Sequence, residues 1–409
     1  MNHAFDALLS DPAVAHLLAC LNGRGEETRI VGGAVRNLLL GVPIADIDLA
    51  TTALPDEIIA RARHAALKIV PVGLAHGTVS LVVAGRLFEV TTLREDIETD
   101  GRHAKVRFGR DFAVDAARRD FTINALSLDA AGKVHDTQGG LGDIEAGRVR
   151  FIGDPDQRIR EDFLRILRFF RFSASYGRGA PDEAGTGACL RQRLGLMNLS
   201  RERLRMEILR LMMARAVVPA LVIMAETGIA ALLTVGMAYP QRLAALLALS
   251  PQSDALARLA AAFVRVPDDA NRLYDRLRLS NREADRLARS ASVLVRLKSI
   301  RNAPSEAQLR TLLFEFGQGS ALEGLALHEA DTNARAASAT RQFLQGTQRP
   351  VLPVSGADVI TRSQLRGPAV GLVLKRFQAA WIRAGFPKEP AAVTRLLEQV
   401  ILAAKSPPL

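Results

Sequence analysis

Two aspartates, Asp46 and Asp48, stand one residue apart and follow a glycine pair, Gly32-Gly33. Residues two apart on a strand point to the same side of a sheet, so both carboxylates would face one way. The glycines would let backbone N–H groups approach a phosphate where the next helix begins. Paired carboxylates beside a phosphate cradle suit Mg²⁺-dependent phosphoryl or nucleotidyl transfer. A turn or a solvated strand face is the alternative reading of an Asp-x-Asp pair.

Two further side chains could join this chemistry. Arg36 lies one helical turn beyond the glycines and could add a charged fork to the same anion. Glu89 lies in the middle of a strand-like run, residues 86–92, and is a candidate third metal carboxylate. A solvated strand position explains Glu89 equally well.

A second motif, Arg118-Arg119-Asp120, follows after a polar and charged stretch. Its guanidinium groups could hold a triphosphate, and its carboxylate could accept a hydrogen bond from a ribose hydroxyl. A charged helix cap is the structural alternative. The stretch before it, residues 94–110, has little periodicity and is expected to form a mobile loop over the site.

A third motif lies in a segment, residues 153–172, whose apolar residues recur at helical spacing. Asp162, Arg165 and Arg168 stand three residues apart and would share one helix face. The Asp162 carboxylate would accept hydrogen bonds, and the guanidinium of Arg165 would donate them. Such a pair can bind the Watson–Crick edges of cytosine and adenine, whereas guanine and uracil place donors and acceptors the other way round. An ordinary i,i+4 ion pair between Glu161 and Arg165 is the alternative.

The elements that must position these residues are an α+β arrangement followed by helices. Strand-like runs end at Val31 and occupy residues 68–72, 77–83 and 86–92, the last two joined by an Ala-Gly hairpin turn. Helical patterns with many arginines dominate from about residue 199 onward. The arginine-rich faces could follow the phosphates of a folded RNA, or could simply be solvated helix faces.

Composition limits the class of protein. The 409 residues are enough for several domains, and 54 Lys+Arg against 43 Asp+Glu leave a net charge of +11, which favours a polyanionic partner. The two cysteines fit no metal or disulfide spacing, and no apolar run is long enough to span a membrane. We therefore expect a cytoplasmic protein without a membrane partner.

The ordered motifs resemble the signature of the class II nucleotidyltransferases, which are the tRNA CCA-adding enzymes and the bacterial poly(A) polymerases of the polymerase β superfamily. The resemblance is strong over residues 28–172 and looser beyond. It implies a polymerase-β-like α+β nucleotidyltransferase domain with a mixed sheet, followed by an all-α C-terminal region. The implied domains are a catalytic head (1–142), a base-selecting neck (143–215), an RNA-binding helical body (216–300) and an RNA-binding helical tail (301–409).

The resemblance also implies the activity and its residues. The expected reaction is template-independent addition of CCA to tRNA 3′ ends from CTP and ATP, with Asp46 and Asp48 holding two Mg²⁺ ions. Asp162 and Arg165 would select the base. The full set of expected nucleotide-binding residues is Gly32, Gly33, Arg36, Arg119, Asp120, Asp162, Arg165, Arg168 and Arg171.

Three alternatives stay open. A poly(A) polymerase shares the same catalytic domain, although such enzymes usually carry a basic residue where this chain has Ala45. An enzyme that adds only CC or only A is the second, and a non-catalytic RNA-binding protein is the third. Asn37 stands where the family usually has an acid, which leaves the orientation of Arg36 undetermined. The sequence allows a monomer or a homodimer.

Overall fold

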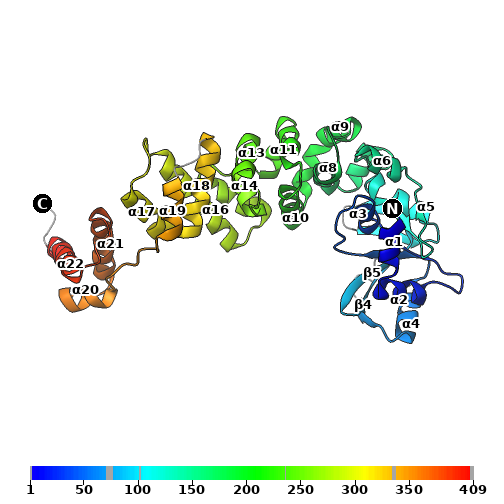
Figure 1. Cartoon of the computed structure of the whole chain (residues 1–409), viewed down its shortest axis with the longest axis horizontal. Coiled ribbons are helices and arrows are strands. Elements are labelled where there is room, and N and C mark those ends of the chain that lie inside the picture. Colours follow the sequence, from blue (N-terminus) through cyan, green and yellow to red (C-terminus); the bar gives the residue numbers. More distant parts are fainter. Residues whose placement is uncertain (1, 71–76, 101–102, 235, 334–337, 406–409) are drawn as a thin grey trace. The chain divides into compact units, whose positions relative to one another are not determined.

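A computed structural model describes residues 2–70, 77–100, 103–234, 236–333 and 338–405. The chain divides into two compact units, Met1–Ala238 with Arg276–Arg278, and Tyr239–Asp275 with Leu279–Leu409. The first unit holds the sheet and its helices, and the second is helical (Figure 1). This boundary falls inside the predicted body, and the four-part division stays a prediction.

The sheet of the first unit is mixed, as expected. Its strand order is β3-β4-β5-β2-β1-β8-β9, in which β2 pairs with β5 in parallel and the other neighbours are antiparallel. The strands are β1 (Thr28–Val31), β2 (Asp48–Thr51), β3 (Lys68–Val70), β4 (Thr78–Val83), β5 (Arg86–Thr92), β8 (Ser127–Leu128) and β9 (Val134–His135).

Helices pack on this sheet through one apolar core. Leu17, Ile58 and Phe88, from two helices and a strand, are all buried in it. Burial of such side chains contributes about 1.5–3 kcal/mol each relative to exposure. The helices of this part are α1 (Asn2–Leu9), α2 (Pro12–Leu21), α3 (Gly33–Leu39), α4 (Pro55–His64), α5 (Phe112–Ala117), the short 3₁₀ helix η2 (Thr122–Asn124) and α6 (Gly140–Ala146).

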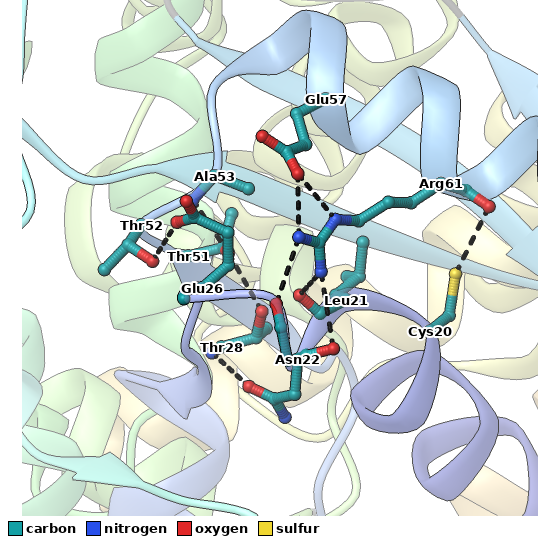
Figure 2. A network of polar contacts seen from close by, with 12 residues as sticks. Cys20, Leu21, Asn22, Glu26, Thr28, Thr51, Thr52, Ala53, Glu57 and Arg61 are labelled. Carbon is teal, nitrogen blue, oxygen red and sulfur yellow. Dashed lines mark hydrogen bonds and ion pairs between the residues drawn. The ribbon is translucent and has the colours of Figure 1, made fainter.

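A polar network anchors the segment that leads into β1 (Figure 2). Arg61 on α4 donates to the carbonyl oxygens of Leu21 and Asn22 at 2.8 and 3.3 Å, and pairs with Glu57 at 2.7 Å. The Asn22 side chain accepts a hydrogen bond from the Thr28 N–H at 2.6 Å. Because these bonds satisfy the orphan carbonyls at the end of α2, they fix where β1 begins.

The stretch expected to be a mobile loop is instead a two-stranded hairpin. β6 (Arg94–Asp100) pairs antiparallel with β7 (His103–Phe108), with an irregular register between Asp96 and Glu98. The mostly polar side chains hid the strand periodicity, because a run without alternating apolar residues carries no period-2 hydrophobic signal. Residues 101 and 102 lie outside the described residues.

The rest of the first unit is helical and is tied to the sheet domain by aromatic rings. Phe121 lies 4.9 Å from Phe151 and 5.3 Å from Phe172, measured between ring centroids, and Phe169 stacks on Phe151 at 5.4 Å. The helices are α7 (Pro155–Glu161), α8 (Leu164–Tyr176), α9 (Glu183–Gln192), the 3₁₀ helix η3 (Arg193–Asn198), α10 (Arg201–Met212), α11 (Val217–Glu226) and α12 (Ile229–Thr234).

The second unit has two apolar clusters of its own. One includes Leu297 and Leu313, and the other includes Phe377 and Trp381. No helix in the described ranges is long and apolar enough to cross a membrane. Its helices are α13 (Pro240–Leu249), α14 (Ala255–Phe263), most of α15 (Pro267–Leu277), α16 (Asn281–Lys298), α17 (Glu306–Phe316), α18 (Gln318–Thr332), α19 (Ser338–Gly346), α20 (Gly356–Ser363), α21 (Pro368–Arg383) and α22 (Pro390–Lys405).

Candidate active site

A polar pocket of about 510 Å³ in the first unit brings most of the predicted site residues together. Three expected residues, Asp46, Glu89 and Arg171, are not among those that line it. The lining residues are Gly32, Gly33, Arg36, Asp48, Arg118, Arg119, Asp120, Asn124, Asp162, Leu164, Arg165, Arg168, Phe172 and Arg203.

The carboxylates alternate with buried residues as expected. Asp46 and Asp48 are exposed, whereas Ile47 and Leu49 are buried in the core. Asp48 is the first residue of β2, and Asp46 lies in the loop before it. Glu89 is the register partner of Asp48 across the parallel pair β2–β5. Neighbouring strands lie about 4.8 Å apart, which puts the Glu89 backbone beside that of Asp48.

Charge crowding is visible at Asp48. Its pKa is raised above the ordinary aspartate value, first because surrounding protein displaces its hydration and next because of the Glu89 charge; Arg119 opposes the shift and Asp46 adds to it. Although Asp48 keeps solvent contact, its charged form is therefore destabilised. An added cation would relieve this repulsion. Among the described residues, no group of three or more His, Cys, Asp or Glu side chains is arranged as a complete metal site.

Gly32 stands where the end of β1 turns into α3. Its φ of +67° and ψ of −120° lie where residues with a Cβ are strained, and its N–H donates to the Leu126 carbonyl at 3.0 Å. A Cβ at Gly32 would lie 2.9 Å from Nη1 of Arg119. The glycine therefore allows the Arg119 guanidinium to lie directly against the backbone of this turn.

The paired arginines are held from both sides. Asp115 on α5 accepts from Arg118 at 2.6 Å and from Arg119 at 3.2 Å. Arg158 on α7 donates through Nη2 to the carbonyl oxygens of Arg118 and Arg119. These contacts fix both guanidinium groups at the rim of the pocket, where they supply positive charge near Asp48.

Asp120 is buried and pairs with Arg168. Its Oδ2 accepts from the Arg168 Nε at 2.7 Å, and its Oδ1 accepts from the Asn124 amide at 3.0 Å and the Phe121 N–H at 2.9 Å. Burial alone would raise the pKa of Asp120, but the Arg168 charge and these hydrogen bonds outweigh it, so the pKa is lowered. With both oxygens engaged inside the protein, this carboxylate orients Arg168.

Asp162 interrupts what the sequence suggested as a continuous helix. α7 ends at Glu161, Asp162 is extended (φ −155°, ψ 105°), and α8 begins at Leu164. The interruption is stabilised by the Asp162 Oδ1, which accepts the Leu164 N–H at 3.1 Å. The expectation that Asp162 shares a helix face with Arg165 and Arg168 is therefore wrong, although all three line the same pocket.

The two expected base-reading side chains have protein partners. Asp162 pairs with Arg203 of α10 at 2.6 Å, and Nη1 of Arg165 pairs with Glu161 at 2.5 Å and with the Arg158 carbonyl at 2.7 Å. Within the described residues, the hydrogen bonds of Arg165 use Nη1 and leave Nε and Nη2 available to a ligand.

Arg171 does not line the pocket. It pairs with the buried Glu207 at 2.6 Å and lies 4.3 Å from the centroid of the Phe172 ring. Glu207 also lies 3.8 Å from Arg168. Arg171 and Glu207 thus support the pocket wall formed by α8 and α10.

Sequence reasoning missed Arg203, Asn124 and Phe172 as lining residues. Arg203 stands in an amphipathic helix among several other arginines, and no local spacing distinguishes it from them. Asn124 follows Asp120 by only four residues. Its closeness in sequence to the paired arginines could have indicated that it lines the pocket.

Known proteins resemble this chain in sequence. The family model described as the poly A polymerase head domain matches residues 28–150. Mitochondrial CCA tRNA nucleotidyltransferase 1 of Mus musculus is 32% identical over 381 residues, covering 89% of this chain and 84% of that protein. The CCA-adding enzyme of Geobacillus thermodenitrificans is 42% identical over 211 residues, 51% of each chain.

Solved structures resemble the whole chain. The Bacillus stearothermophilus CCA-adding enzyme in complex with CTP aligns with a TM-score of 0.74 and 28% identity, covering 99% of this chain and 100% of that one. The Thermotoga maritima CCA-adding enzyme complexed with tRNA aligns with a TM-score of 0.66 and 18% identity, covering 98% of each chain, which supports the fold.

Proposed function

The chain belongs to the CCA tRNA nucleotidyltransferase family, and on this premise we propose that it adds CCA to tRNA 3′ ends, using CTP and ATP without a nucleic-acid template. One observation carries the proposal: a single pocket joins the strand carboxylate Asp48, the paired arginines and the Asp162/Arg165 pair. A transferase that selects its nucleotide with protein side chains needs these three groups together.

Asp46 and Asp48, with Glu89 beside them, are the residues that would hold divalent metal, and Mg²⁺ suits them best. Mg²⁺ prefers oxygen ligands and is usually held by one or two carboxylates plus substrate phosphates, so a complete protein cage is not required. The crowding that raises the pKa of Asp48 fits such a cation. When bound, the metal lowers the pKa of the primer 3′-hydroxyl and stabilises the pyrophosphate leaving group.

The chain's own residues would divide the remaining work. Arg118 and Arg119 would supply charge for the triphosphate beside the turn formed by Gly32 and Gly33. We propose that Asp120 positions Arg168, since its oxygens are already engaged.

Base selection falls to Asp162 and Arg165, which line the same pocket. A carboxylate accepts from the amino group of cytosine or adenine, and the guanidinium donates to their ring acceptors. The helical residues 216–409 would hold the tRNA, largely through its phosphates and shape. We place this reaction in the cytoplasm, as the sequence suggests.

The decisive assay offers a tRNA that ends before CCA, with CTP and ATP separately and together. The proposal expects three added nucleotides with both substrates and two with CTP alone. A long A tract from ATP alone would identify a poly(A) polymerase, and a CC or A product alone would identify a partial enzyme. No incorporation by the wild-type chain under any condition would overturn the proposal.

The metal assignment has its own test. Asp46→Ala should reduce incorporation of both nucleotides by at least about 10³-fold, because loss of a metal ligand removes several kcal/mol of transition-state stabilisation. Asp56→Ala, which removes an exposed aspartate from the first turn of α4, is the matched control and should keep wild-type rates. Near-wild-type activity of Asp46→Ala would show that the assignment is wrong.

A further inference from the structure

We propose that Arg36 is a positioning residue which, together with Asn37, Asn124 and Tyr176, forms a partly buried polar joint between the turn at Gly32 and helix α8. The inference rests on the proposed function, because α8 and the residue pair at its start would read the nucleotide base. It differs from the expectation that Arg36 grips the triphosphate directly.

The guanidinium of Arg36 is almost fully engaged by protein groups. The residue is 6% exposed. Nε and Nη2 donate to the Asn37 side-chain oxygen at 3.1 and 2.7 Å, and Nη2 also donates to the Tyr176 hydroxyl at 2.9 Å. Nη1 donates to the Asn124 side-chain oxygen. Four of its five N–H donors are thereby used, which leaves little capacity for a phosphate.

Aromatic rings cover the same guanidinium. Its central carbon lies 4.0 Å from the centroid of the Tyr176 ring and 5.1 Å from that of Phe172, both on α8. Cation–π contacts of this kind are stronger when the cation is desolvated. Arg36 therefore contacts α8 through a hydrogen bond and through ring faces, while its backbone belongs to α3.

The joint reaches each part of the proposed active site. The Asn37 amide donates to the Pro43 carbonyl at 2.9 Å, in the loop that leads to Asp46. The Asn124 amide donates to Asp120, which holds Arg168. A single buried side chain thus links the metal-binding loop, the turn after the paired arginines, and α8.

Tyr176 is the last residue of α8, and the base-reading pair stands where that helix begins. Because a helix moves largely as a rigid body, loss of the contacts at Tyr176 would let α8 tilt and would shift the base-reading residues at its start. A displacement of about 1 Å at a reacting centre costs up to 10²-fold in rate. The joint should therefore matter more for choosing the correct base than for binding the triphosphate, which Arg118 and Arg119 would contact under the proposed function.

The experiment compares Tyr176→Leu, Arg36→Met and a control, Arg86→Met, which removes an exposed ion pair with Asp11 at 2.6 Å, at the start of β5 and away from α8. Three quantities are measured on the full-length chain with a tRNA ending before CCA. They are the ratio of kcat/KM for CTP over UTP, the Kd for pyrophosphate, and the Tm.

We expect Tyr176→Leu and Arg36→Met each to lower the CTP/UTP ratio roughly tenfold, with the Kd for pyrophosphate unchanged within about twofold. Tyr176→Phe keeps the ring and loses only the hydroxyl acceptor, so its ratio should fall between those of Tyr176→Leu and wild type. Arg86→Met should match wild type in all three quantities.

Other results would overturn the inference. If Arg36→Met raises the Kd for pyrophosphate tenfold while Tyr176→Leu leaves selection unchanged, Arg36 is a phosphate ligand. If both variants lower the Tm but keep the wild-type CTP/UTP ratio well below the Tm, the joint is only structural. A wild-type chain that adds no CCA overturns the proposed function itself, whereas an active wild type with unaffected variants overturns this inference alone.

Discussion

Gly32→Ala should destabilise the protein far more than the neighbouring change Gly33→Ala. Gly32 has a φ of +67° and a ψ of −120°, a backbone conformation that costs a non-glycine residue about 1–3 kcal/mol. Its added Cβ would also lie 2.9 Å from the Arg119 Nη1, so that guanidinium must move by a few tenths of an ångström. A total near 2 kcal/mol corresponds to a fall in Tm of about 4–8 °C in a unit of this size.

Gly33→Ala is the matched control. A Cβ there would lie 3.6 Å from the Arg36 Nη2, an ordinary van der Waals contact, and the φ of Gly33 is not positive. Its free energy of unfolding should change by less than about 0.5 kcal/mol. Differential scanning calorimetry of both variants, with and without Arg119→Ala, separates the two causes. In the Arg119→Ala background the steric conflict disappears, so Gly32→Ala should cost less there.

Equal Tm changes for Gly32→Ala and Gly33→Ala would refute the reasoning from backbone conformation. An Arg119→Ala background that leaves the cost of Gly32→Ala unchanged would refute only the steric part. Both results can be interpreted without any assumption about the substrate, because the Tm is measured without nucleotide.

Two further predictions concern charge. Arg191 and Gln192 lower the pKa of Asp156 to about 2 from an ordinary value of 3.8, so this pairing stabilises the fold above about pH 4 and is lost as the pH falls towards about 2. Since Arg191 is 60% exposed, Asp156→Asn should lower the free energy of unfolding by only about 1 kcal/mol at pH 7. In urea unfolding, the difference between wild type and variant should disappear as the pH falls from about 4 to about 2. A difference that stays constant with pH would contradict this prediction. Glu207→Gln leaves the half-buried Arg168 and Arg171 without the buried carboxylate that they share, and it should cost about 3 kcal/mol in urea unfolding. Glu183→Gln on the surface should cost less than about 0.5 kcal/mol, and equal costs would contradict the role given to the buried carboxylate.

Local patterns in the sequence were enough to locate the pocket. The alternation of Asp46 and Asp48 with buried Ile47 and Leu49 is a property of four consecutive residues, and the structure confirms it. Several strands were also predictable, because they carry strong β-forming residues, whereas the mixed sheet was implied only by the family resemblance. The pairing of Glu89 with Asp48 depends on the register of β2 and β5, which no local pattern specifies.

The rest depends on contacts between distant residues. Apolar periodicity continues from Ile159 through Phe163 to Ile166, so it concealed the break at Asp162. The Asp162 partner Arg203 comes from another helix, and only tertiary packing brings the two side chains together. The partners of Arg36 include Tyr176, which lies far along the chain. A phosphate contact for Arg36 could therefore be proposed from the sequence, but the use of its N–H donors by protein groups could not be predicted.

The strand order of the sheet also governs how the protein can fold during synthesis. β1 pairs on one side with β2 and on the other with β8, where Ile30 meets Leu128. Until β8 leaves the ribosome, β1 presents an unpaired edge, and non-local strand pairing of this kind is slow and exposed to aggregation. The nascent chain therefore has to protect β1 and β2, the strand that carries Asp48, until β8 arrives, and we expect aggregation during synthesis to begin in this interval.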